Sequence, residues 1–491
     1  MAATPTVVLL PVWGAGHLMP MLEAGKRLLL ASSGGAGGSP ALSVTVLVMR
    51  PPTEQLATEV EAHVCRAQED AAAAGLDVRF HRLPAVELPA DSEGPVEFCS
   101  RAVQLHAPHI RAAVAALASP VAALVLDLFC TPLIDVAREA AVPAYVYFTS
   151  NAAALSFFLR LPALCEEVDG EFEDMEGGAA DIPGLPPVPP LALPTPVMAK
   201  TKPECAWYAY HGRRFADADG VVVNTAAELE RGVLAAIAGG RATRGRPAPA
   251  LYPVGPVICF PEPAAGPPHG CVRWLRDQPP ASVVFLCFGS GGYFKAAQAR
   301  EVARGLERSG HRFLWVLRGA PAAGARSPSD ADLAELLPEG FVERTRGRGL
   351  VWPTTAPQKE ILAEAAVGGF VTHCGWNSIL ESLWFGVPMA PWPLYAEQHL
   401  NAFALVAGMG VAVAMEVDRR RGNFVEAAEL ERAVRVLMGG GEEGRKAREK
   451  AAEMQAACRK AVAGDGSSTA ALKRLSNDII MRMTADELAR R

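Results

Sequence analysis

Short apolar runs alternate with longer stretches of helical periodicity along the first half of the chain. The runs are apolar throughout rather than at every second position, so they predict parallel strands buried on both faces of a sheet. Helices are expected after Gly16, where apolar residues recur at helical spacing, and between Pro95 and Leu117. The expected strands span residues 6–11, 42–48, 78–83, 122–127, 144–148 and 220–224.

The second half of the chain repeats this rhythm. A helix is expected over residues 298–309, and the chain reads as helical from about Ala428 to its end. Strands that alternate with helices predict an α/β fold, here of two doubly wound, Rossmann-like domains that face a central cleft. Ligands of such sheets bind at the carboxyl ends of the strands. The expected strands span residues 282–288, 312–317, 349–351 and 368–372.

Proline and glycine mark the expected domain boundaries. Tyr252-Pro253-Val254-Gly255-Pro256 opens a segment rich in both residues, typical of an interdomain linker. We therefore expect an N-terminal domain over 1–250, a linker over 251–270, a C-terminal domain over 271–465 and a helical segment over 466–491 that packs back on the N-terminal domain. Another composition change, from acidic residues to prolines between Glu166 and Pro196, indicates either a floppy insertion or the rim of a binding cleft.

Charge and cysteine content exclude several classes of function. The 491 residues include 47 Lys and Arg and 53 Asp and Glu, a formal net charge of −6, which offers no attraction for nucleic acid or an anionic membrane. Ten cysteines are scattered without metal-ligand spacing, as in a reduced intracellular protein. The first residues lack a signal-peptide pattern, and no apolar run approaches about 20 residues. We expect a cytoplasmic monomer with no metal, nucleic-acid partner or membrane span.

The stretch from Gly368 to Leu383 has the pattern of a buried strand, a small turn and a helix. Asn377 or Ser378 is the expected N-cap, and Glu381 is the expected acid of the first turn. Free backbone N–H groups and the helix dipole make such a helix start an anion site. His373 adds a donor aimed at the same place, so a diphosphate is the natural ligand. The alternative is an ordinary capped helix with a satisfied core histidine.

A second loop, Gly289-Ser290-Gly291-Gly292, also follows an expected strand. Its small residues allow close approach to a phosphate, and Ser290 can donate a hydrogen bond. The lysine of a P-loop is missing, which argues against an ATPase.

His17 and Asp127 follow two expected strands of the first sheet. Since both stand at carboxyl ends, they can meet although they are far apart in the sequence. A carboxylate on one imidazole nitrogen fixes the tautomer and leaves the other nitrogen as a base. A phenol, with a pKa near 10, needs such a base when it attacks an electrophile. The alternative role for His17 is that of a turn or packing residue.

The stretch from Thr355 to Gln398 closely resembles the signature box of plant secondary-product glycosyltransferases, which use UDP-sugars. The resemblance extends over the whole chain and is nearest to members that act on flavonoids and related phenolics. It implies the two-domain GT-B fold. The matching residues are Ala356-Pro357-Gln358, His373-Cys374-Gly375-Trp376-Asn377-Ser378, Glu381-Ser382, Gly386-Val387-Pro388 and Trp392-Pro393-Leu394-Tyr395-Ala396-Glu397-Gln398.

The resemblance also implies a role for each matching residue. His17 is the general base and Asp127 its partner, for an inverting displacement that needs no metal because the helix start and His373 neutralise the leaving diphosphate. A glutamine at the last position of the box usually goes with glucose, so UDP-glucose is the expected donor. The implied donor contacts are Ser290, His373, Asn377 and Ser378 on the diphosphate, Trp376 beside the donor, Glu381 on the ribose, Ala356 and Gln358 on the uridine, Glu397 and Gln398 on the sugar, and Thr149 on the sugar or phosphate.

One departure from the box concerns uridine binding. Thr355 stands where the family has a tryptophan that stacks on the uracil. Three explanations are open: Trp352 substitutes, the loss is tolerated, or the donor site belongs to an engineered or impaired variant. The expected apolar walls of the acceptor site are Trp13, Phe129 and Phe148, for which ordinary core packing is the alternative.

Two other functions remain as rivals. A nucleotide-dependent dehydrogenase would carry GxGxxG after its first strand, but Gly14-Ala15-Gly16-His17-Leu18-Met19 lacks the third glycine. A non-catalytic UDP-sugar-binding protein would explain Thr355 as decay, yet His17 and Asp127 are intact. Within the glycosyltransferase reading, C-glycosylation of the same acceptors is an alternative to O-glycosylation.

Overall fold

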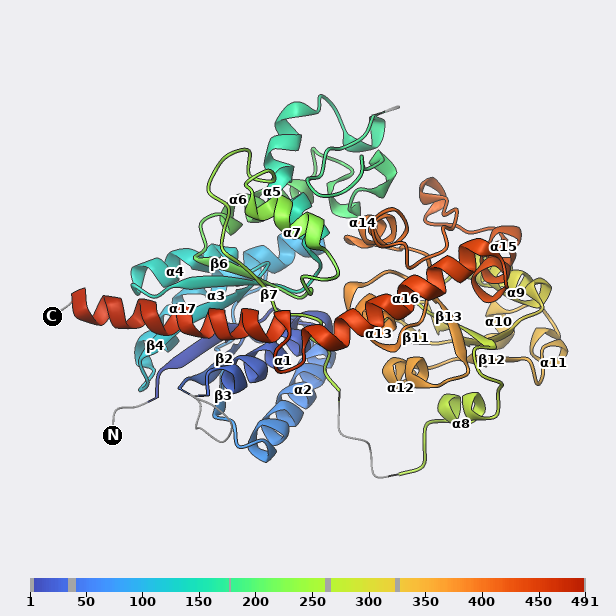
Figure 1. Cartoon of the computed structure of the whole chain (residues 1–491), viewed down its shortest axis with the longest axis horizontal. Helices are drawn as coiled ribbons and strands as arrows, with labels where there is room; N and C mark the ends of the chain where they lie inside the picture. The colour runs from blue at the N-terminus through green and yellow to red at the C-terminus, as the bar shows by residue number, and fades with distance from the viewer. Residues whose placement is uncertain (1–3, 34–40, 176–177, 261–265, 323–326, 490–491) are drawn as a thin grey trace. The chain divides into compact units, whose positions relative to one another are not determined.

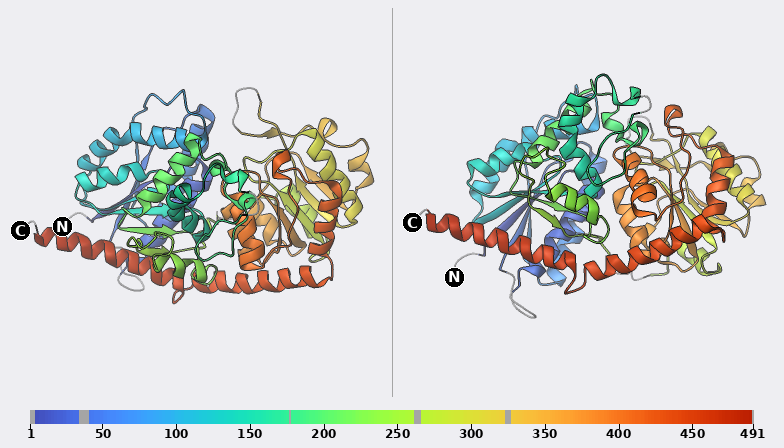
Figure 2. Two further views of the ribbon diagram at one scale, coloured as in Figure 1. Left: turned by 90° about the horizontal axis from the view of Figure 1, so that it is seen from above. Right: turned by 45° about the horizontal axis from the view of Figure 1, so that its top comes forward.

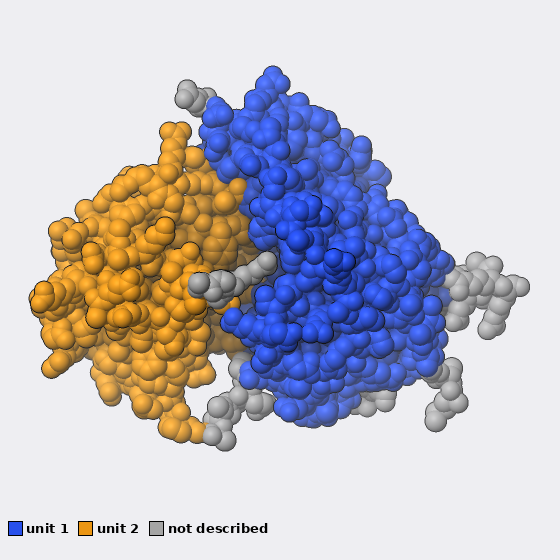
Figure 3. Space-filling model, turned by 180° about the vertical axis from the view of Figure 1, so that it is seen from behind, with its two compact units in different colours: residues 1–190, 196–259, 460–491 blue, residues 191–195, 260–459 orange. Residues whose placement is uncertain are grey.

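The computed structural model describes residues 4–33, 41–175, 178–260, 266–322 and 327–489. The chain forms two compact units, coloured separately in Figure 3. Unit 1 comprises residues 1–190, 196–259 and 460–491, and unit 2 comprises 191–195 and 260–459. The parts of the expected segments that fall on residues 1–3, 34–40, 176–177, 261–265, 323–326 and 490–491 lie outside the described residues.

Unit 1 contains a seven-stranded parallel sheet in the order β3-β2-β1-β4-β5-β6-β7. The order reverses between β1 and β4, which pair directly, so the carboxyl ends of these two strands are neighbours. Such a reversal is where open α/β sheets place their ligands. The strands are β1 (Thr6–Leu10), β2 (Ser43–Val48), β3 (Val78–Arg82), β4 (Val121–Asp127), β5 (Ala144–Phe148), β6 (Gly220–Val223) and β7 (Leu251–Pro253).

Helices cover both faces of this sheet (Figure 1, Figure 2). The helix expected over 95–117 is α3 (Pro95–Ala116), which begins with proline in its first turn, where the missing N–H has no intrahelical partner. The start of α5 is capped twice, by Asn151 and by the buried carboxylate of Glu230. The other helices of unit 1 are α1 (Ala15–Ala31), α2 (Glu54–Ala73), α4 (Ile134–Glu139), α5 (Ala152–Glu167), α6 (Pro203–Phe215), α7 (Arg231–Ala238) and α17 (Ser467–Ala489).

Unit 2 contains a five-stranded parallel sheet in the order β12-β9-β8-β13-β14, with a short antiparallel pair, β10 and β11, beside it. Its strands are β8 (Val283–Cys287), β9 (Arg312–Val316), β10 (Arg318–Gly319), β11 (Ser329–Asp330), β12 (Gly349–Trp352), β13 (Val367–Thr372) and β14 (Met389–Pro391). Its helices are α8 (Gly270–Arg276), α9 (Ala296–Ser309), α10 (Leu333–Leu336), α11 (Phe341–Arg344), α12 (Gln358–Ala363), α13 (Trp376–Phe385), α14 (Gln398–Phe403), α15 (Ala427–Met438) and α16 (Glu442–Ala461), the last of which ends in unit 1. The predicted α/β class with two parallel, Rossmann-like sheets is confirmed.

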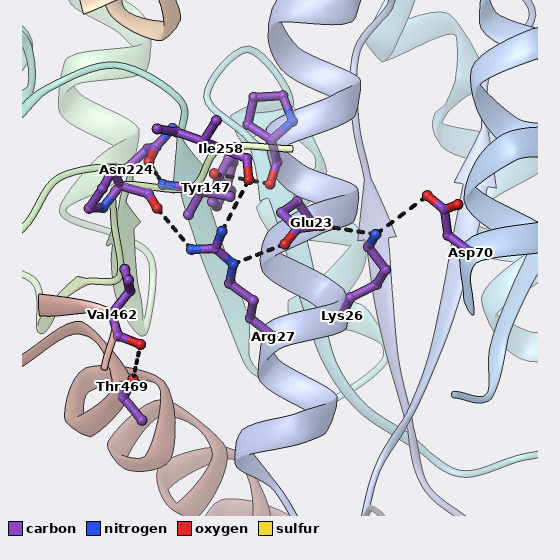
Figure 4. Close-up of polar contacts among 12 residues, drawn as sticks. Glu23, Lys26, Arg27, Asp70, Tyr147, Asn224, Ile258, Val462 and Thr469 are labelled. Carbon is purple, nitrogen blue, oxygen red and sulfur yellow. Dashed lines mark hydrogen bonds and ion pairs between the residues drawn. The ribbon is translucent and has the colours of Figure 1, made fainter. Parts of the chain in front are cut away.

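The stretch expected to begin the linker instead completes unit 1. Leu251–Pro253 forms β7 at the edge of the sheet, where a proline is tolerated because its missing N–H faces no neighbouring strand. The following residues are held by a side chain of unit 1. Arg27 donates to the carbonyl of Pro256 at 2.8 Å and to that of Ile258 at 3.1 Å. Figure 4 labels Arg27 and Ile258. Unit 1 therefore extends to Cys259, beyond the expected end at residue 250, and the main part of unit 2 begins at Phe260, before the expected start at residue 271.

The C-terminal helix α17 belongs to unit 1. Its residues Leu472, Leu475 and Ile479 lie in the same buried cluster as residues of α1 and of the sheet. Tyr252 of β7 also donates a 2.6 Å hydrogen bond to Asp478. Unit 1 resumes at Lys460, earlier than the expected boundary at residue 466.

The proline-rich excursion is packed rather than loose. Ile182, Val188 and Leu193 are fully buried, and Ala180 pairs with Val188 in an isolated bridge. Five of its residues, Leu191–Thr195, belong to unit 2 although the chain on both sides belongs to unit 1. Across the described residues, no helix is long and apolar enough for a bilayer crossing.

Candidate active site

The structure brings His17 and Asp127 together at the carboxyl ends of β1 and β4. Asp127 is the last residue of β4 and has a fully buried side chain, while 28% of the His17 side chain is exposed. Nδ1 of His17 lies 2.9 Å from Oδ2 of Asp127. The buried carboxylate accepts a hydrogen bond from Nδ1–H, so the proton of the neutral ring is on Nδ1 and Nε2 carries the lone pair. The helix α1 begins at Ala15, before the start expected after Gly16, so His17 stands in its first turn.

A tight turn after β4 orients the carboxylate. Oδ1 of Asp127 accepts a 3.0 Å hydrogen bond from the backbone N–H of Phe129, and the Asp127 carbonyl accepts one of 2.7 Å from Cys130. The ring of Phe129 lies with its centroid 5.6 Å from that of His17. Phe129 is therefore an apolar neighbour of the imidazole, as an acceptor wall would be.

Behind this turn lies His211 of α6, which sequence reasoning missed. Ser100 donates to the Val96 carbonyl at 2.7 Å, so its oxygen accepts from Nε2 of His211 at 2.8 Å. Nδ1 of His211 is then the acceptor for the Thr131 hydroxyl at 2.7 Å. Burial lowers the pKa of His211 to about 3, so the ring stays neutral. A single histidine within a helix gives no sequence signal for this arrangement.

The other two expected acceptor walls, Trp13 and Phe148, differ in how deeply they are buried. Trp13 is half-buried, and its indole N–H donates to the Met49 carbonyl at 3.1 Å. Phe148 has 0% exposed surface and packs edge-to-face against Phe158 and Phe215. We therefore correct Phe148 to a core residue, because a strand covered on both faces buries the side chains of both faces.

Thr149 directly follows Phe148 and is also mostly buried, at the carboxyl end of β5. This places it at the same edge of the sheet as Asp127, since β4 and β5 are parallel neighbours.

In unit 2, α13 begins without the side-chain cap that was expected. Gly375 is the N-cap residue and Trp376 the first helical residue, so neither Asn377 nor Ser378 is the cap, and Glu381 lies beyond the first turn. The helix ends at Gly386, whose φ is 72°. Because no side chain of its own caps the helix, its first N–H groups remain suited to an anionic ligand.

His373 fits between two glycines. A Cβ atom placed on Gly289 or Gly375 would lie 2.6 or 2.5 Å from its Nε2 atom. The side chain is buried, and Nδ1 has no hydrogen-bond partner among the described residues. Burial lowers the pKa of His373 to about 4, so the ring is neutral at pH 7. A neutral ring offers an N–H donor, and the role of His373 in neutralising a bound diphosphate stays a prediction.

Gln358 links the two helices that flank this loop. Its amide donates to Oγ of Ser378 at 2.9 Å and to Oε2 of Glu381 at 2.7 Å. Burial raises the pKa of Glu381, and the hydrogen bond from Gln358 opposes this rise. These three expected donor residues thus form one cluster, with Ala356 half-buried in the loop before α12 and Ser290 exposed after β8.

Thr355 is exposed, and its carbonyl accepts a 3.2 Å hydrogen bond from the indole of Trp352. The Trp352 ring lies edge-on to His269, with centroids 4.8 Å apart, and covers Gly270. Trp352 is therefore engaged at the start of α8, and this geometry gives no support to the explanation that it replaces the missing ring.

The end of the signature box forms a tight loop. The carboxamide oxygen of Gln398 accepts hydrogen bonds from the N–H groups of Leu394 and Tyr395, at 2.9 and 3.0 Å. Glu397, half-buried, precedes α14, and Trp376 is nearly fully buried at the start of α13. Asn401 donates to the Cys374 carbonyl at 3.0 Å, which ties α14 to the His373 loop.

In the part of the chain that the structure describes, no group of three or more His, Cys, Asp or Glu side chains could hold a metal ion.

Known proteins resemble this chain over nearly its full length. A sequence model of the family described as "UDP-glucoronosyl and UDP-glucosyl transferase" matches residues 254–441. A malvidin galactosylase of Oryza sativa subsp. japonica is 62% identical over 485 residues, 98% of this chain and 98% of the relative. The chain belongs to the plant UDP-glycosyltransferase family.

Two further relatives are similar to this UDP-glycosyltransferase over nearly its full length. An anthocyanidin 3-O-glucosyltransferase of Manihot esculenta is 38% identical and covers 95% of this chain and 100% of its own. The structure of Phytolacca americana UGT2 complexed with UDP-2fluoro-glucose and pterostilbene superposes with a TM-score of 0.81 at 36% identity, covering 97% of this chain and 99% of that chain. The family resemblance and the GT-B fold expected from the signature box are confirmed.

Proposed function

We propose that the protein is an inverting glycosyltransferase that moves glucose from UDP-glucose to a hydroxyl of a small, flat phenolic acceptor, with His17 as general base. The observation that carries this proposal is the 2.9 Å contact between His17 Nδ1 and the buried Asp127 carboxylate. A phenol with a pKa near 10 is almost fully protonated at pH 7, so a positioned base is needed as its oxygen attacks.

The reaction is a single displacement at the anomeric carbon. The acceptor oxygen forms a bond to C1 of the sugar, its proton passes to Nε2 of His17, and the bond between C1 and the diphosphate oxygen breaks. Asp127 stabilises the imidazolium that results, through the hydrogen bond that its carboxylate accepts from Nδ1–H of His17. UDP leaves with the bonding electrons, and His17 returns its proton to solvent.

The donor is proposed to lie against the start of α13. The helix dipole and the backbone N–H groups there stabilise the charge that develops on the leaving diphosphate. His373 adds an N–H donor, and Ser290, Asn377 and Ser378 add further donors, so we propose that no metal ion takes part. The cluster of Gln358 and Glu381 is proposed to bind uridine and ribose, with Ala356 and Thr355 beside it and Trp376 next to the donor. Glu397, Gln398 and Thr149 are proposed to bind the sugar.

UDP-galactose is the second candidate donor. Gln398 at the end of the box favours glucose, whereas the relative that is 62% identical is named a galactosylase. The two sugars differ only in the configuration of one hydroxyl group, so both donors belong in the test.

The acceptor is proposed to be an anthocyanidin or a related flavonoid. The names of two relatives contain malvidin and anthocyanidin, and a third was crystallised with pterostilbene. Trp13 and Phe129 are proposed as apolar walls for such a ring, beside the His17 imidazole.

Product analysis tests the proposal. The purified full-length chain is incubated with UDP-glucose or UDP-galactose and with malvidin, flavonols and pterostilbene. Mass spectrometry is expected to show a hexoside, NMR an inverted β-linkage, and acid hydrolysis the release of sugar that distinguishes an O-glycoside from a C-glycoside. Activity is expected to persist in EDTA.

Two outcomes would overturn it. UDP binding without any hexoside, across both donors and all acceptors, would favour the non-catalytic sugar-nucleotide-binding alternative. An α-linked product would rule out the single displacement.

A further inference from the structure

A short segment of the proline-rich excursion is bound beside the end of the signature box. The guanidinium of Arg419 donates to the carbonyls of Leu191 and Leu193 at 2.6 and 2.8 Å, and to Oγ1 of Thr195 at 3.3 Å. The N–H of Thr195 donates to the Ala396 carbonyl at 2.8 Å. Leu191–Thr195 therefore lies directly against the residue that precedes Glu397.

His399 and Asn423 hold the same loop from another side. Nε2 of His399 lies 2.9 Å from Oδ1 of Asn423, and the amide nitrogen of Asn423 donates to the Leu394 carbonyl at 2.8 Å. Nδ1 of His399 lies 3.4 Å from Oγ1 of Thr195. The backbone carbonyl of Asn423 also accepts from the indole of Trp392 at 2.9 Å, which fixes Asn423 itself.

The direction of each hydrogen bond follows from the chemistry of the groups. Since Oδ1 of Asn423 can only accept, Nε2 of His399 carries the ring proton and Nδ1 is an acceptor. The Thr195 hydroxyl then donates to Nδ1 and accepts from Arg419. A one-way chain results, from Arg419 through Thr195, His399 and Asn423 to the Leu394 carbonyl, in which every link has a donor and an acceptor.

The chain ends on the loop that holds Gln398. The Gln398 carboxamide oxygen accepts from the N–H groups of Leu394 and Tyr395, so its position follows that of residues 394–395. Asn423 fixes Leu394 through its carbonyl, and Thr195 fixes Ala396 next to Glu397. None of these contacts involves α12 or the first turn of α13, where the diphosphate and uridine are proposed to bind.

We propose that Arg419 and Asn423 are positioning residues for donor-sugar selectivity: they set the place of Glu397 and Gln398 without touching the sugar. This inference rests on the proposed function. A displacement of about 1 Å in a group that recognises a hydroxyl is enough to change discrimination strongly. Loss of the chain should therefore alter the preference between UDP-glucose and UDP-galactose, while UDP itself binds as before.

Arg419→Ala tests this with three measurements on the full-length enzyme and its best acceptor. The KM of the preferred UDP-sugar is expected to rise about 10-fold, and the ratio of kcat/KM for UDP-glucose to that for UDP-galactose to change at least about 5-fold. The Kd of UDP, measured by calorimetry, is expected to stay within about 2-fold of the wild-type value, because the UDP contacts lie elsewhere.

The neighbouring residue supplies a matched control. Arg420 is exposed in the same short helical turn, Arg419–Arg421, and has no hydrogen bond or ion pair among the described residues. Arg420→Ala removes the same charge, so it is expected to leave all three quantities unchanged. Arg419→Lys keeps the charge and part of the donor set, and it is expected to recover part of the wild-type ratio.

Asn423→Gly is a second route to the same result. Asn423 has a φ of 64°, which glycine adopts readily, so this variant removes the two side-chain contacts without backbone strain. It is expected to shift the donor ratio in the same direction as Arg419→Ala. If Arg419→Ala does not fold, Asn423→Gly tests the positioning role by itself.

The outcomes separate the two proposals. A wild-type enzyme that uses neither donor contradicts the proposed function. An active wild type whose Arg419→Ala and Asn423→Gly variants keep the donor ratio, or lose UDP affinity as much as UDP-sugar affinity, overturns the positioning role alone.

Discussion

The two units build their parts of the site in opposite ways. In unit 1, the proposed reactive pair consists of two side chains that are 110 residues apart and meet because β1 and β4 are neighbours at the reversal of the sheet order. In unit 2, most of the proposed donor contacts come from one continuous stretch, residues 355–398, whose loops and helix starts are adjacent in the sequence. The proposed proton transfer in unit 1 depends on a single side-chain contact, whereas the proposed donor binding in unit 2 depends on many weak contacts.

This difference predicts different responses to mutation. Removal of one member of the pair in unit 1 should abolish a step of the reaction. Removal of one group in unit 2 should weaken donor binding in proportion, because the remaining groups still bind. The following variants test this contrast.

His17→Ala should have the largest effect. Loss of a general base lowers kcat by about 10²- to 10⁴-fold, while the KM of the UDP-sugar should change little, because His17 is not proposed to hold the diphosphate. Asp127→Asn should also lower kcat strongly, since an amide in place of the carboxylate favours the wrong tautomer. Steady-state kinetics with varied donor measures both. If His17→Ala retained more than about a tenth of the activity, the base would have to be another group.

Thr355→Trp should strengthen donor binding. Stacking of a base on an aromatic ring contributes about 1–3 kcal/mol, so restoring the ring should lower the donor KM by about 5- to 150-fold with kcat nearly constant. Thr354→Trp, one residue earlier in the same loop, is the control and should not reproduce the gain. An unchanged or higher KM for Thr355→Trp would show that the ring position is not next to the uracil.

Gly375→Ala tests how closely His373 must be placed. The φ of Gly375 is −64°, which suits alanine. The added Cβ, however, would lie 2.5 Å from Nε2 of His373, so the ring must move. We expect the donor KM to rise about 10-fold and kcat to fall less, since the other groups around the diphosphate remain. Gly408→Ala, where the added carbon has open space, should have no effect. Equal kinetics for both variants would contradict a role of His373 in donor binding.

The smallest effect concerns stability in acid. His211 has a pKa lowered to about 3, and His373 and His399 have pKa values lowered to about 4, all mainly by burial. Between these values and the unfolded value near 6.5, the unfolded chain binds more protons, so the free energy of unfolding falls as the pH falls. Each histidine contributes at most about 1.4 kcal/mol per pH unit.

His211→Asn measures this contribution. Thermal midpoints between pH 7 and pH 5 should fall less steeply in the variant than in the wild type, because one protonation site of the unfolded chain is gone. His81→Asn, on the exposed strand β3, controls for the loss of a histidine elsewhere. A slope identical to that of the wild type would contradict the neutral, buried state of His211.

The fold could be predicted from the sequence largely because its strands are apolar on both faces. β5 has the expected bounds, and α3 ends one residue before the expected end. The prediction failed where a strand lies at an edge: Leu251–Pro253 carries a proline and precedes Gly255-Pro256, so its composition is that of a linker. The partner that makes it a strand, β6, is not visible in local sequence.

The site was predictable only in part. Most of the proposed donor residues lie in one continuous motif, which the family resemblance identifies; Ser290 and Thr149 lie outside it. His211, Arg419 and Asn423 were not predicted, because their importance comes from contacts with distant residues rather than from their type or spacing. The cap of α13 was assigned incorrectly because Asn377 and Ser378 are good capping residues, whereas the helix begins one residue before them.

The burial of α17 in unit 1 has a consequence for biosynthesis. Leu472, Leu475 and Ile479 fill the same core as α1 and the first strands, so the hydrophobic interior of unit 1 stays incomplete until α17 leaves the ribosome. Unit 1 breaks off at Cys259 and resumes at Lys460, 201 positions later (460 − 259). Synthesis at about 5–20 residues per second therefore delays the completion of unit 1 by roughly 10–40 s. During that interval the nascent chain exposes an apolar surface on its earliest-made half, and the later-made unit 2 is free to fold first.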